Sequence, residues 1–451
     1  MKISKATTRV LQTPADNPLV VGIPQEGTRE FVTLELDTDE GIQGIGVTFF
    51  GGALTQALKQ SVDDLCNLII GEDPYPVEAI SERLKFISGS AGPEGIFTLA
   101  LSAVDMALWD IKGKALGQSV CSLLGGYSDR APTYASGALM RPMNVEYLAE
   151  AGPRLVELGF KQMKTQMGAE NTAEKEVARI RVLREAIGDD IDLMCDINQL
   201  WNVNQAIDIG QRVEQYHLFW LEDVVARDDY QGLARVADSL NTPIAAGEYV
   251  YGIRPFRHML EARSVDIVMI DLLRVGGITQ FRKVAGMAEA FNLPVVSHLI
   301  PEIQVHNIAA IPNGLTVEYM PWTLRLFEET PEIENGEIVV PDKPGLGLKF
   351  DQDVIKKYQV NQLFIYIVLR EVGMVYQLRA YTINRGMMDS WINLFNEHIR
   401  PLHDRLGILV HSTWVNADRT EFIWIRQFND ASEIQAKEAE YFASPERTEL
   451  A

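Results

Sequence analysis

After about residue 131, short apolar runs alternate repeatedly with amphipathic helical segments. Each run has the length of a buried strand, and helical text such as residues 173–188 separates most of them. Repeated strand–helix units of this size predict parallel strands, and eight of them predict an α/β fold, a closed β/α barrel of the TIM type. The eight runs read PTYAS, FKQMKTQ, IDLMCDIN, LFWLEDV, TPIAAGE, VDIVMID, LPVVSH and LTVEYM.

The rest of the chain predicts further domains, since 451 residues are too many for one ordinary domain. Residues 1–130 begin with alternating strand text, interrupted by a DEG hairpin signal, and continue in long helices, as an α+β domain does. We assign the barrel to residues 131–330 and a Pro/Gly-rich segment that returns to the first domain to residues 331–358. A linker over residues 359–373 then leads to a last module at 374–451.

The last module reads as strand, helix, strand, strand and helix, from VYQLRAYTI to ASEIQAKEAEYFA. This β-α-β-β-α order matches a ferredoxin-like α+β unit that lacks its final strand. Its histidines, His398, His403 and His411, are scattered, without the spacing of a metal site. We therefore expect no catalytic set in this module; the resemblance described below implies a dimerisation or docking role instead.

Charge and composition narrow the range of partners. The net charge of −21 argues against nucleic acid, whose phosphates require a basic surface. No apolar run reaches the ~18 residues of a membrane span, and MKISKATTRV lacks the apolar core of a secretory signal. Cys66, Cys121 and Cys195 are far apart and odd in number, so we expect buried free thiols. These features predict a cytoplasmic protein with no membrane or nucleic-acid partner.

Carboxylates end three consecutive strands of the predicted barrel. Asp196, Glu222 and Glu248 follow one another at intervals of 26 residues, one strand–helix unit each, so they are expected at the same height. Functional groups of such barrels lie at the carboxyl ends of the strands. Three crowded anions are tolerated if a hard divalent cation neutralises them, and oxygen ligands favour Mg²⁺ over zinc. The alternative, for any one of them, is a salt bridge to a barrel lysine or arginine.

The opposite side of the barrel mouth predicts a base. Asp271 and His298 end neighbouring strands, and a carboxylate bound to an imidazole fixes its tautomer and raises its basicity. Lys164 supplies positive charge for an oxyanion, and Glu318, if protonated, donates a hydrogen bond to it. A buried ion pair between Lys164 and Glu318 is the alternative. Together these groups suit removal of a proton α to a carboxylate held by the metal and Lys164.

The sequence resembles the mandelate racemase and muconate lactonizing enzyme branch of the enolase superfamily over residues 1–358. The resemblance rests on eight motifs in family order and spacing: SAVDMALWDIKGKALG, MKTQ, CDINQLW, WLED, AAGEY, DIVMIDLLRVGGIT, VVSH and VEYMPW. It implies a capping α+β domain over the barrel, with Mg²⁺ on the three carboxylates and the histidine–aspartate pair as base. It also implies that Glu318 contacts the substrate carboxylate. Cap loops near residues 15–30 and 49–56 are expected to close the site and select the substrate.

The family commonly carries Lys-x-Lys on the second strand, and its second lysine is a base on one face of the substrate. Gln166 stands at that position, and an amide cannot accept a catalytic proton at neutral pH. We expect Gln166 and Asn198 to contact substrate instead. A single base, His298, suffices for dehydration, so the resemblance favours a sugar-acid dehydratase that gives a 2-keto-3-deoxy acid.

Three other functions stay open at this point. A racemase or epimerase would recruit Lys164 as its second base, and a cycloisomerase of an anhydro-sugar acid would form the same enediolate. A catalytically silent scaffold is the third. Residues 374–451 resemble the NIPSNAP group of ferredoxin-like modules. Because such modules pair and barrels of this family associate, we expect a homo-oligomer.

Overall fold

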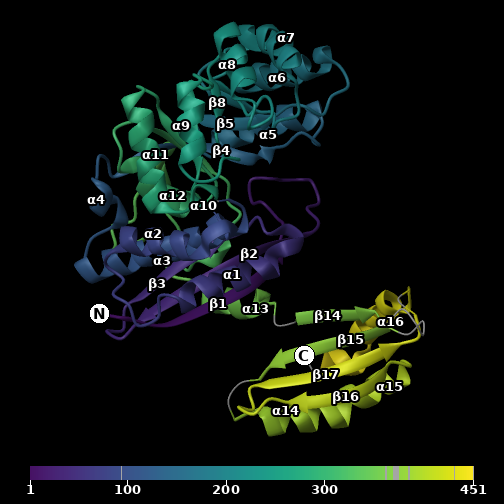
Figure 1. The fold of residues 1–451 in the computed structure, drawn as a ribbon. Helices are drawn as coiled ribbons and strands as arrows, with labels where there is room; N and C mark the ends of the chain where they lie inside the picture. Colours follow the sequence, from purple (N-terminus) through teal and green to yellow (C-terminus); the bar gives the residue numbers. More distant parts are fainter. Residues whose placement is uncertain (93, 361–362, 369–374, 384–385, 431, 450–451) are drawn as a thin grey trace. The chain divides into compact units, whose positions relative to one another are not determined.

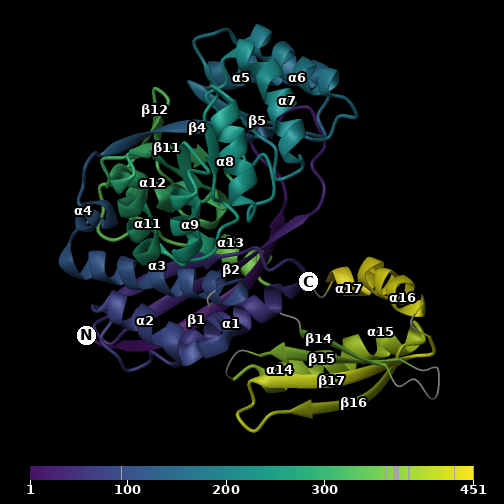
Figure 2. The same ribbon diagram turned by 45° about the horizontal axis from the view of Figure 1, so that its top comes forward.

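The computed structural model describes residues 1–92, 94–360, 363–368, 375–383, 386–430 and 432–449. The chain forms two compact units, which we call the barrel unit (Met1–Gln359) and the C-terminal unit (Val360–Ala451). Figures 1 and 2 show the helices and strands of both units.

The eight predicted runs form a closed parallel barrel, which confirms the predicted fold class (Figure 1). The strands are β4 (Arg130–Leu139), β5 (Gln162–Gln166), β6 (Asp192–Asp196), β7 (Trp220–Glu222), β8 (Ile244–Ala246), β9 (Ile267–Asp271), β10 (Val295–His298) and β11 (Gly314–Tyr319). Pairing of β11 with β4 closes the ring. Large apolar side chains fill its interior, among them Tyr134, Trp220 and Met269.

Helices surround this barrel, and most of them are amphipathic, so that their apolar sides pack on the strands. They are α5 (Val145–Glu157), α6 (Ala173–Ile187), α7 (Val203–Val213), α8 (Tyr230–Ser239), α9 (Arg254–Glu261), α10 (Leu272–Val275), α11 (Ile278–Ala290) and α12 (Pro301–Ala309). Polar side chains start several of them. Asn144, Thr172 and Asn202 each accept a backbone N–H of the first helical turn, as N-caps do.

The N-terminal α+β part holds an antiparallel sheet and four helices. These are β1 (Ile3–Pro14), β2 (Thr28–Thr38), β3 (Gln43–Thr48), α1 (Thr55–Asn67), α2 (Val77–Ser88), α3 (Ile96–Leu116) and α4 (Val120–Leu124). Helix α3 is buried along most of its length and packs directly on β3. A methyl group on Gly46 would lie 2.1 Å from the carbonyl oxygen of Ala103, so the contact requires glycine.

Segments after the barrel return to both parts of the unit. The hairpin of β12 (Ile333–Glu334) and β13 (Glu337–Val339) pairs with β4, and α13 (Gln352–Tyr358) contacts β1. Buried Asp110 of α3 joins these layers. Its Oδ2 accepts the Ile45 N–H at 3.0 Å, and its Oδ1 accepts the Leu346 N–H at 2.8 Å. One carboxylate therefore connects the sheet, the long helix and the returning segment.

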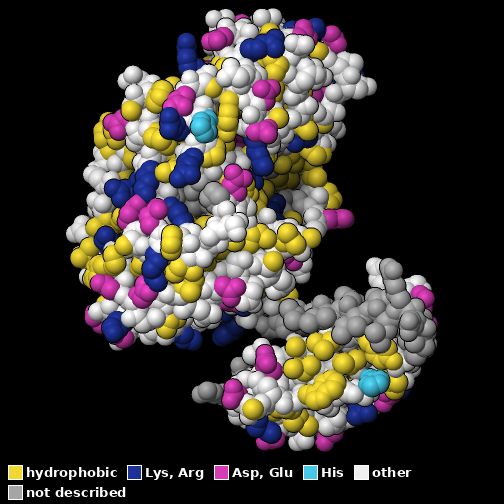
Figure 3. All heavy atoms as spheres, in the orientation of Figure 1, with side chains coloured by type: hydrophobic (Ala, Val, Ile, Leu, Met, Phe, Trp, Pro, Cys, Tyr) yellow, Lys and Arg dark blue, Asp and Glu magenta, His cyan; other side chains and the backbone are white. Residues whose placement is uncertain are grey.

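The C-terminal unit is an antiparallel sheet in the order β14-β15-β17-β16. Its elements are β14 (Leu363–Val368), β15 (Val375–Thr382), α14 (Met388–Leu394), the π-helical turn η5 (Phe395–Ile399), α15 (Arg400–Arg405), β16 (Leu409–Val415), β17 (Glu421–Phe428), α16 (Ser432–Ala443) and α17 (Pro445–Glu449). Phe395 packs on Phe422 and Trp424, so the first helical segment covers the sheet. On the opposite face Leu378, Ile423 and Ile425 are half-buried, and Figure 3 shows hydrophobic side chains gathered on this unit.

Residues 361–362 and 369–373 of the linker predicted over 359–373 lie outside the described residues, and the part between them is Leu363–Val368. This segment is strand β14, and it pairs antiparallel with β15 along its whole length. Its β-branched and aromatic residues favour a strand, and the exposed edge of β15 supplies the partner. The final strand missing from the predicted ferredoxin-like unit does not follow α16 among the described residues. Strand β14, which precedes the predicted module at residues 374–451, brings the sheet to four strands instead.

The three cysteines are free and buried, as predicted. Among the described residues, no helix combines the length and the apolar character that crossing a lipid bilayer requires.

A buried imidazole also fastens the returning segment. His306 of α12 accepts the Cys121 N–H at Nδ1 (3.3 Å), so its Nε2 donates to the Leu346 carbonyl (3.0 Å). This arrangement requires the neutral ring. Burial lowers the pKa of His306 to about 4, although the bond to Leu346 acts in the other direction.

The neutral form of His306 predicts loss of stability in acid. The pKa of His306 is lower in the folded state than in the unfolded state. Its contribution to the free energy of unfolding is therefore fully present above about pH 6.5. As the pH falls towards 4, about 3 kcal/mol of it is lost. We expect His306→Gln to flatten the pH dependence of the unfolding free energy in this range, measured by urea titration. His258→Gln, at an exposed position of α9, is the control. Equal slopes for wild type and His306→Gln would contradict the prediction.

Candidate active site

The carboxyl ends of the barrel strands surround a cavity of about 140 Å³. Most of the side chains predicted from the strand ends lie in its wall: Lys164, Gln166, Asp196, Asn198, Glu248, His298 and Glu318. Phe50, from the predicted cap loop at 49–56, lines it as well. The site residues therefore come together at one end of the barrel.

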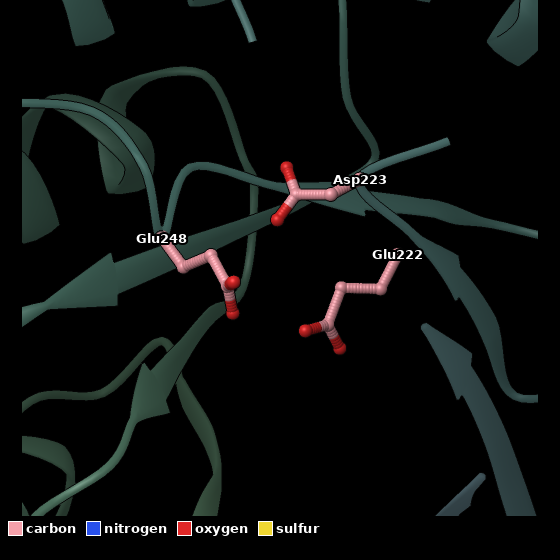
Figure 4. A group of neighbouring side chains, drawn as sticks. All are labelled: Glu222, Asp223 and Glu248. Carbon is pink, nitrogen blue, oxygen red and sulfur yellow. The ribbon is translucent and has the colours of Figure 1, made fainter. Parts of the chain in front are cut away.

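Three carboxylates meet at one side of this end. Glu222, Asp223 and Glu248 each place an oxygen within 4.8 Å of the other two, and Figure 4 shows the three side chains converging. All three are buried, with at most 3% exposure. Glu222 ends β7, whereas Glu248 follows β8 after Gly247, whose φ of 132° turns the chain.

Asp223 was not predicted for this group, and it lies beside Glu222 and Glu248 in it. Successive side chains of a strand point to opposite faces, but the positive φ of Asp223, 44°, breaks that alternation just after Glu222. The carboxylate of Asp196 accepts hydrogen bonds from the Asn198 N–H (2.8 Å) and from Gln166 Nε2 (3.3 Å). The ED pair in WLED was the available signal. The assignment of Asp196, opposite Glu222 in the strand register, stays a prediction.

This cluster of three carboxylates, Glu222, Asp223 and Glu248, fits a hard divalent cation. Burial raises the pKa of Glu222 and Asp223 well above their ordinary values, and the neighbouring Glu248 raises them further. Burial likewise raises the pKa of Asp196 to about 6. Oδ2 of Asp223 is buried and has no hydrogen-bond partner among the described residues. A divalent cation would neutralise the crowded charges and give that oxygen a partner, and an all-oxygen set suits Mg²⁺.

The predicted dyad lies across from this group. His298 Nδ1 is 2.6 Å from Asp271 Oδ2, and Asp271 Oδ1 accepts the Arg274 N–H at 2.7 Å. Because an ionised carboxylate only accepts, Nδ1 carries the proton and Nε2 faces the carboxylates, 3.0 Å from Glu248 Oε2. Burial lowers the pKa of His298, but Glu248, Glu318 and Asp271 outweigh it, so the pKa is raised.

Lys164 is held by two carboxylates. Its Nζ lies 2.8 Å from Glu222 Oε1 and 2.9 Å from Glu318 Oε1, which is the ion pair considered as the alternative to a substrate contact. Burial opposes the charge, but Glu222 and Glu318 raise the pKa of Lys164 well above its ordinary value. Lys164 is thus a fixed cation.

Glu318 was expected to donate a hydrogen bond only if it were protonated, and its contacts favour the ionised form. Burial alone would raise its pKa, but Lys164 and His298 lower it to about 2. Ionised Glu318 accepts hydrogen bonds from Ser136 Oγ (2.7 Å) and the Leu299 N–H (2.7 Å). It therefore has no proton to donate to a substrate oxyanion.

Gln166 and Asn198 belong to one amide network. Gln166 Nε2 donates to Asn198 Oδ1 at 3.0 Å, which also accepts from Arg141 Nη2 at 2.7 Å. Asn198 Nδ2 donates to the Tyr249 hydroxyl at 3.1 Å. Gln166 therefore lies in an amide network whose charged neighbours are the Arg141 guanidinium and the Asp196 carboxylate.

Arg274 was missed by the sequence analysis, although it lies in the DLLRVGG motif. Its guanidinium stacks on Phe50 (3.9 Å to the ring centre), and its Nη1 donates to the Glu248 carbonyl at 2.9 Å. Nη1 is also 3.6 Å from Asp271 Oδ2. Arg274 thus links the cap loop, the carboxylate group and the dyad.

Residues 5–125 match the mandelate racemase/muconate lactonizing enzyme N-terminal domain, and residues 146–354 match the enolase C-terminal domain-like family. The chain belongs to the mandelate racemase/muconate lactonizing enzyme family of the enolase superfamily.

Named members of this family act on acid sugars. The L-talarate/galactarate dehydratase of Salmonella typhimurium is 31% identical over 355 residues, covering 78% of this chain and 88% of the relative. The 3,6-anhydro-alpha-L-galactonate cycloisomerase of Streptomyces coelicolor is 33% identical over 337 residues, covering 74% and 92%. A solved L-talarate dehydratase from Polaromonas sp. JS666, complexed with Mg and L-glucarate, superposes with a TM-score of 0.74 at 30% identity, covering 79% and 97%.

Substitution of the clustered carboxylates tests which of them bind Mg²⁺. We expect Asp223→Asn to weaken Mg²⁺ binding about tenfold or more, because it removes a charged oxygen from a buried set. Isothermal titration of the full chain measures this, with Asp238→Asn on the exposed side of α8 as control. Asp196→Asn in the same titration compares the two aspartates. Wild-type affinity in Asp223→Asn would exclude Asp223 from the ligand set.

Proposed function

We propose that this chain is a Mg²⁺-dependent sugar-acid dehydratase, which removes the proton α to a carboxylate and eliminates the β-hydroxyl as water. The observation that carries the proposal is the single base. Among the described residues of the cavity wall, His298 is the one imidazole, and it can accept a proton at Nε2. Its Nδ1 lies 2.6 Å from the Asp271 carboxylate, which orients the ring. The kinship to named dehydratases supports it.

In the proposed reaction His298 Nε2 takes the α-proton, and the substrate becomes an enediolate. The imidazolium then returns this proton to the β-hydroxyl, the carbon–oxygen bond breaks, and water leaves. The remaining enol gives a 2-keto-3-deoxy acid. Asp271 holds the ring and stabilises the imidazolium between the two transfers.

Glu222, Asp223 and Glu248, with Asp196 beside them, would hold the Mg²⁺. When bound, Mg²⁺ supplies Lewis-acid stabilisation of the substrate carboxylate. Lys164 keeps Glu222 and Glu318 in place and adds a fixed positive charge to the same wall.

Racemisation fits the site less well. It needs a second base on the opposite face, and Lys164 is the candidate. Its raised pKa keeps Lys164 protonated at neutral pH, so it has no free lone pair to accept a proton. Gln166 cannot replace it.

Cycloisomerisation is the second candidate, and the 33% identical cycloisomerase favours it. It uses the same proton abstraction with a ring oxygen as the leaving group, so one base also suffices. The two differ in mass balance, because a dehydratase product is lighter by one water and a cycloisomerase product is an isomer.

A substrate panel in deuterium oxide tests these functions. We expect a sugar acid to give a 2-keto-3-deoxy acid, detected by mass and as a semicarbazone. An anhydro-sugar acid or lactone converted to an isomer would favour cycloisomerisation instead. Deuterium in recovered substrate of inverted configuration would indicate a racemase, and neither conversion nor exchange with any acid would indicate a scaffold.

His298→Asn tests the base. We expect turnover to fall by about 10²–10⁴, because the amide keeps a hydrogen bond to Asp271 but cannot transfer a proton. Mg²⁺ binding, measured by titration, should persist, and the exposed variant His258→Asn should turn over like wild type. Normal turnover by His298→Asn would show that another group is the base.

A further inference from the structure

The C-terminal unit buries polar side chains where its sheet meets its helices. Strands β15 and β17 alternate, and the face covered by helices carries Gln377, Arg379 and Arg426 among apolar neighbours. Arg379 is 2% exposed and Arg426 is fully buried. Buried guanidinium groups are costly unless an anion accompanies them, so their placement requires an explanation.

One carboxylate serves both arginines. Glu438 Oε1 of α16 accepts from Arg379 Nη2 at 3.0 Å and also from Arg426 Nη2. His403 adds no charge to this layer, because its Nδ1 donates to the Ile399 carbonyl (2.8 Å) and its Nε2 accepts from Arg426 Nη1 (3.2 Å). Burial lowers the pKa of His403 to about 4, in keeping with a neutral ring.

A cavity of about 100 Å³ adjoins this layer. Its wall includes Arg379 and Tyr381 from β15, Trp391 from α14 and Arg447 from α17, and no aspartate or glutamate among the described residues. Arg379 Nη1 donates to the Tyr381 hydroxyl at 3.2 Å, which leaves the hydroxyl proton available. Half-exposed Phe442 places the cavity at the surface of the unit.

A further donor lies in the same wall. The indole Nε1 of Trp391 is buried and has no hydrogen-bond partner in the described part of the chain. Tyr441 also lies in the wall, and burial raises its pKa. Arg447, Arg379 and Arg426 act in the opposite direction, so the positive charge of all three arginines reaches the Tyr441 hydroxyl. The cavity thus combines guanidinium, indole and hydroxyl donors with aromatic surfaces.

We propose that this cavity binds a small oxyanion, a carboxylate or a phosphate. Charge-assisted hydrogen bonds from arginine are strongest to such groups, and the donor-rich wall has no carboxylate to repel them. The aromatic side chains favour an anion that carries a flat apolar group. The site lies wholly within the C-terminal unit and is independent of the chemistry proposed for the barrel.

Fluorine resonances of the full chain labelled with 5-fluorotryptophan read this site directly. The chain has 7 tryptophans, and loss of one signal in Trp391→Phe assigns Trp391. The probes are sodium benzoate, sodium acetate and inorganic phosphate, titrated at constant ionic strength with chloride. We expect the Trp391 signal to move saturably with at least one probe, at an apparent Kd of about 1 mM or below. The preference between benzoate and phosphate then distinguishes the two ligand classes.

A pair of arginine variants decides whether the cavity binds the probe. Arg447→Gln removes a guanidinium from the wall, and we expect it to weaken the apparent Kd about tenfold. Arg400→Gln removes the same charge from an exposed position of α15 and should leave the Kd unchanged. The proposal is overturned if no probe moves the Trp391 signal, or if both variants weaken binding equally.

Discussion

The repulsion among the carboxylates that the parallel strands bring to one end of the barrel governs the chemistry of the candidate active site. Asp196 and Glu222 are register partners on neighbouring strands, and Asp223 and Glu248 lie within reach of the same space. Without solvent, such groups favour the neutral form, as the raised pKa of Glu222 shows. A cation keeps the carboxylates ionised, and the fold supplies one itself, Lys164, between Glu222 and Glu318. One ammonium cannot neutralise the whole set, so the site favours a divalent ion.

The same electrostatics divide the tasks among the other side chains. Lys164 is a cation because two carboxylates hold it, and Glu318 is an acceptor because Lys164 and His298 keep it ionised. His298 differs from both, since Asp271 occupies one of its nitrogens and leaves the other directed to the carboxylates. An asymmetric site with one mobile proton follows from these contacts. These contacts support the proposed elimination more than a racemisation, which needs a base on each face.

Buried polar groups also connect the layers of each unit. In the barrel unit, Asp110 and His306 both bind the backbone of Leu346, so the returning segment is fixed by directional bonds and not by apolar contact alone. In the C-terminal unit, Glu438 joins a helix to two arginines of the sheet. The first set is internally satisfied, whereas the second adjoins an open cavity rich in donors. That difference separates a structural role from a binding one.

The sequence by itself determined the barrel, because eight apolar runs at strand–helix spacing have few other ways to bury their surface. It also determined which strand ends carry Asp196, Glu222, Glu248, Asp271 and His298, since the end of a parallel strand fixes the height of its side chain. Only the tertiary structure decided which groups touch. The loop after β7 gives Asp223 its left-handed backbone conformation. The ionisation of Glu318 depends on the ammonium group of Lys164, which lies 2.9 Å away but is distant in sequence. Strand β14 likewise became visible only with the edge that it pairs with, because a strand needs a partner that local sequence does not contain.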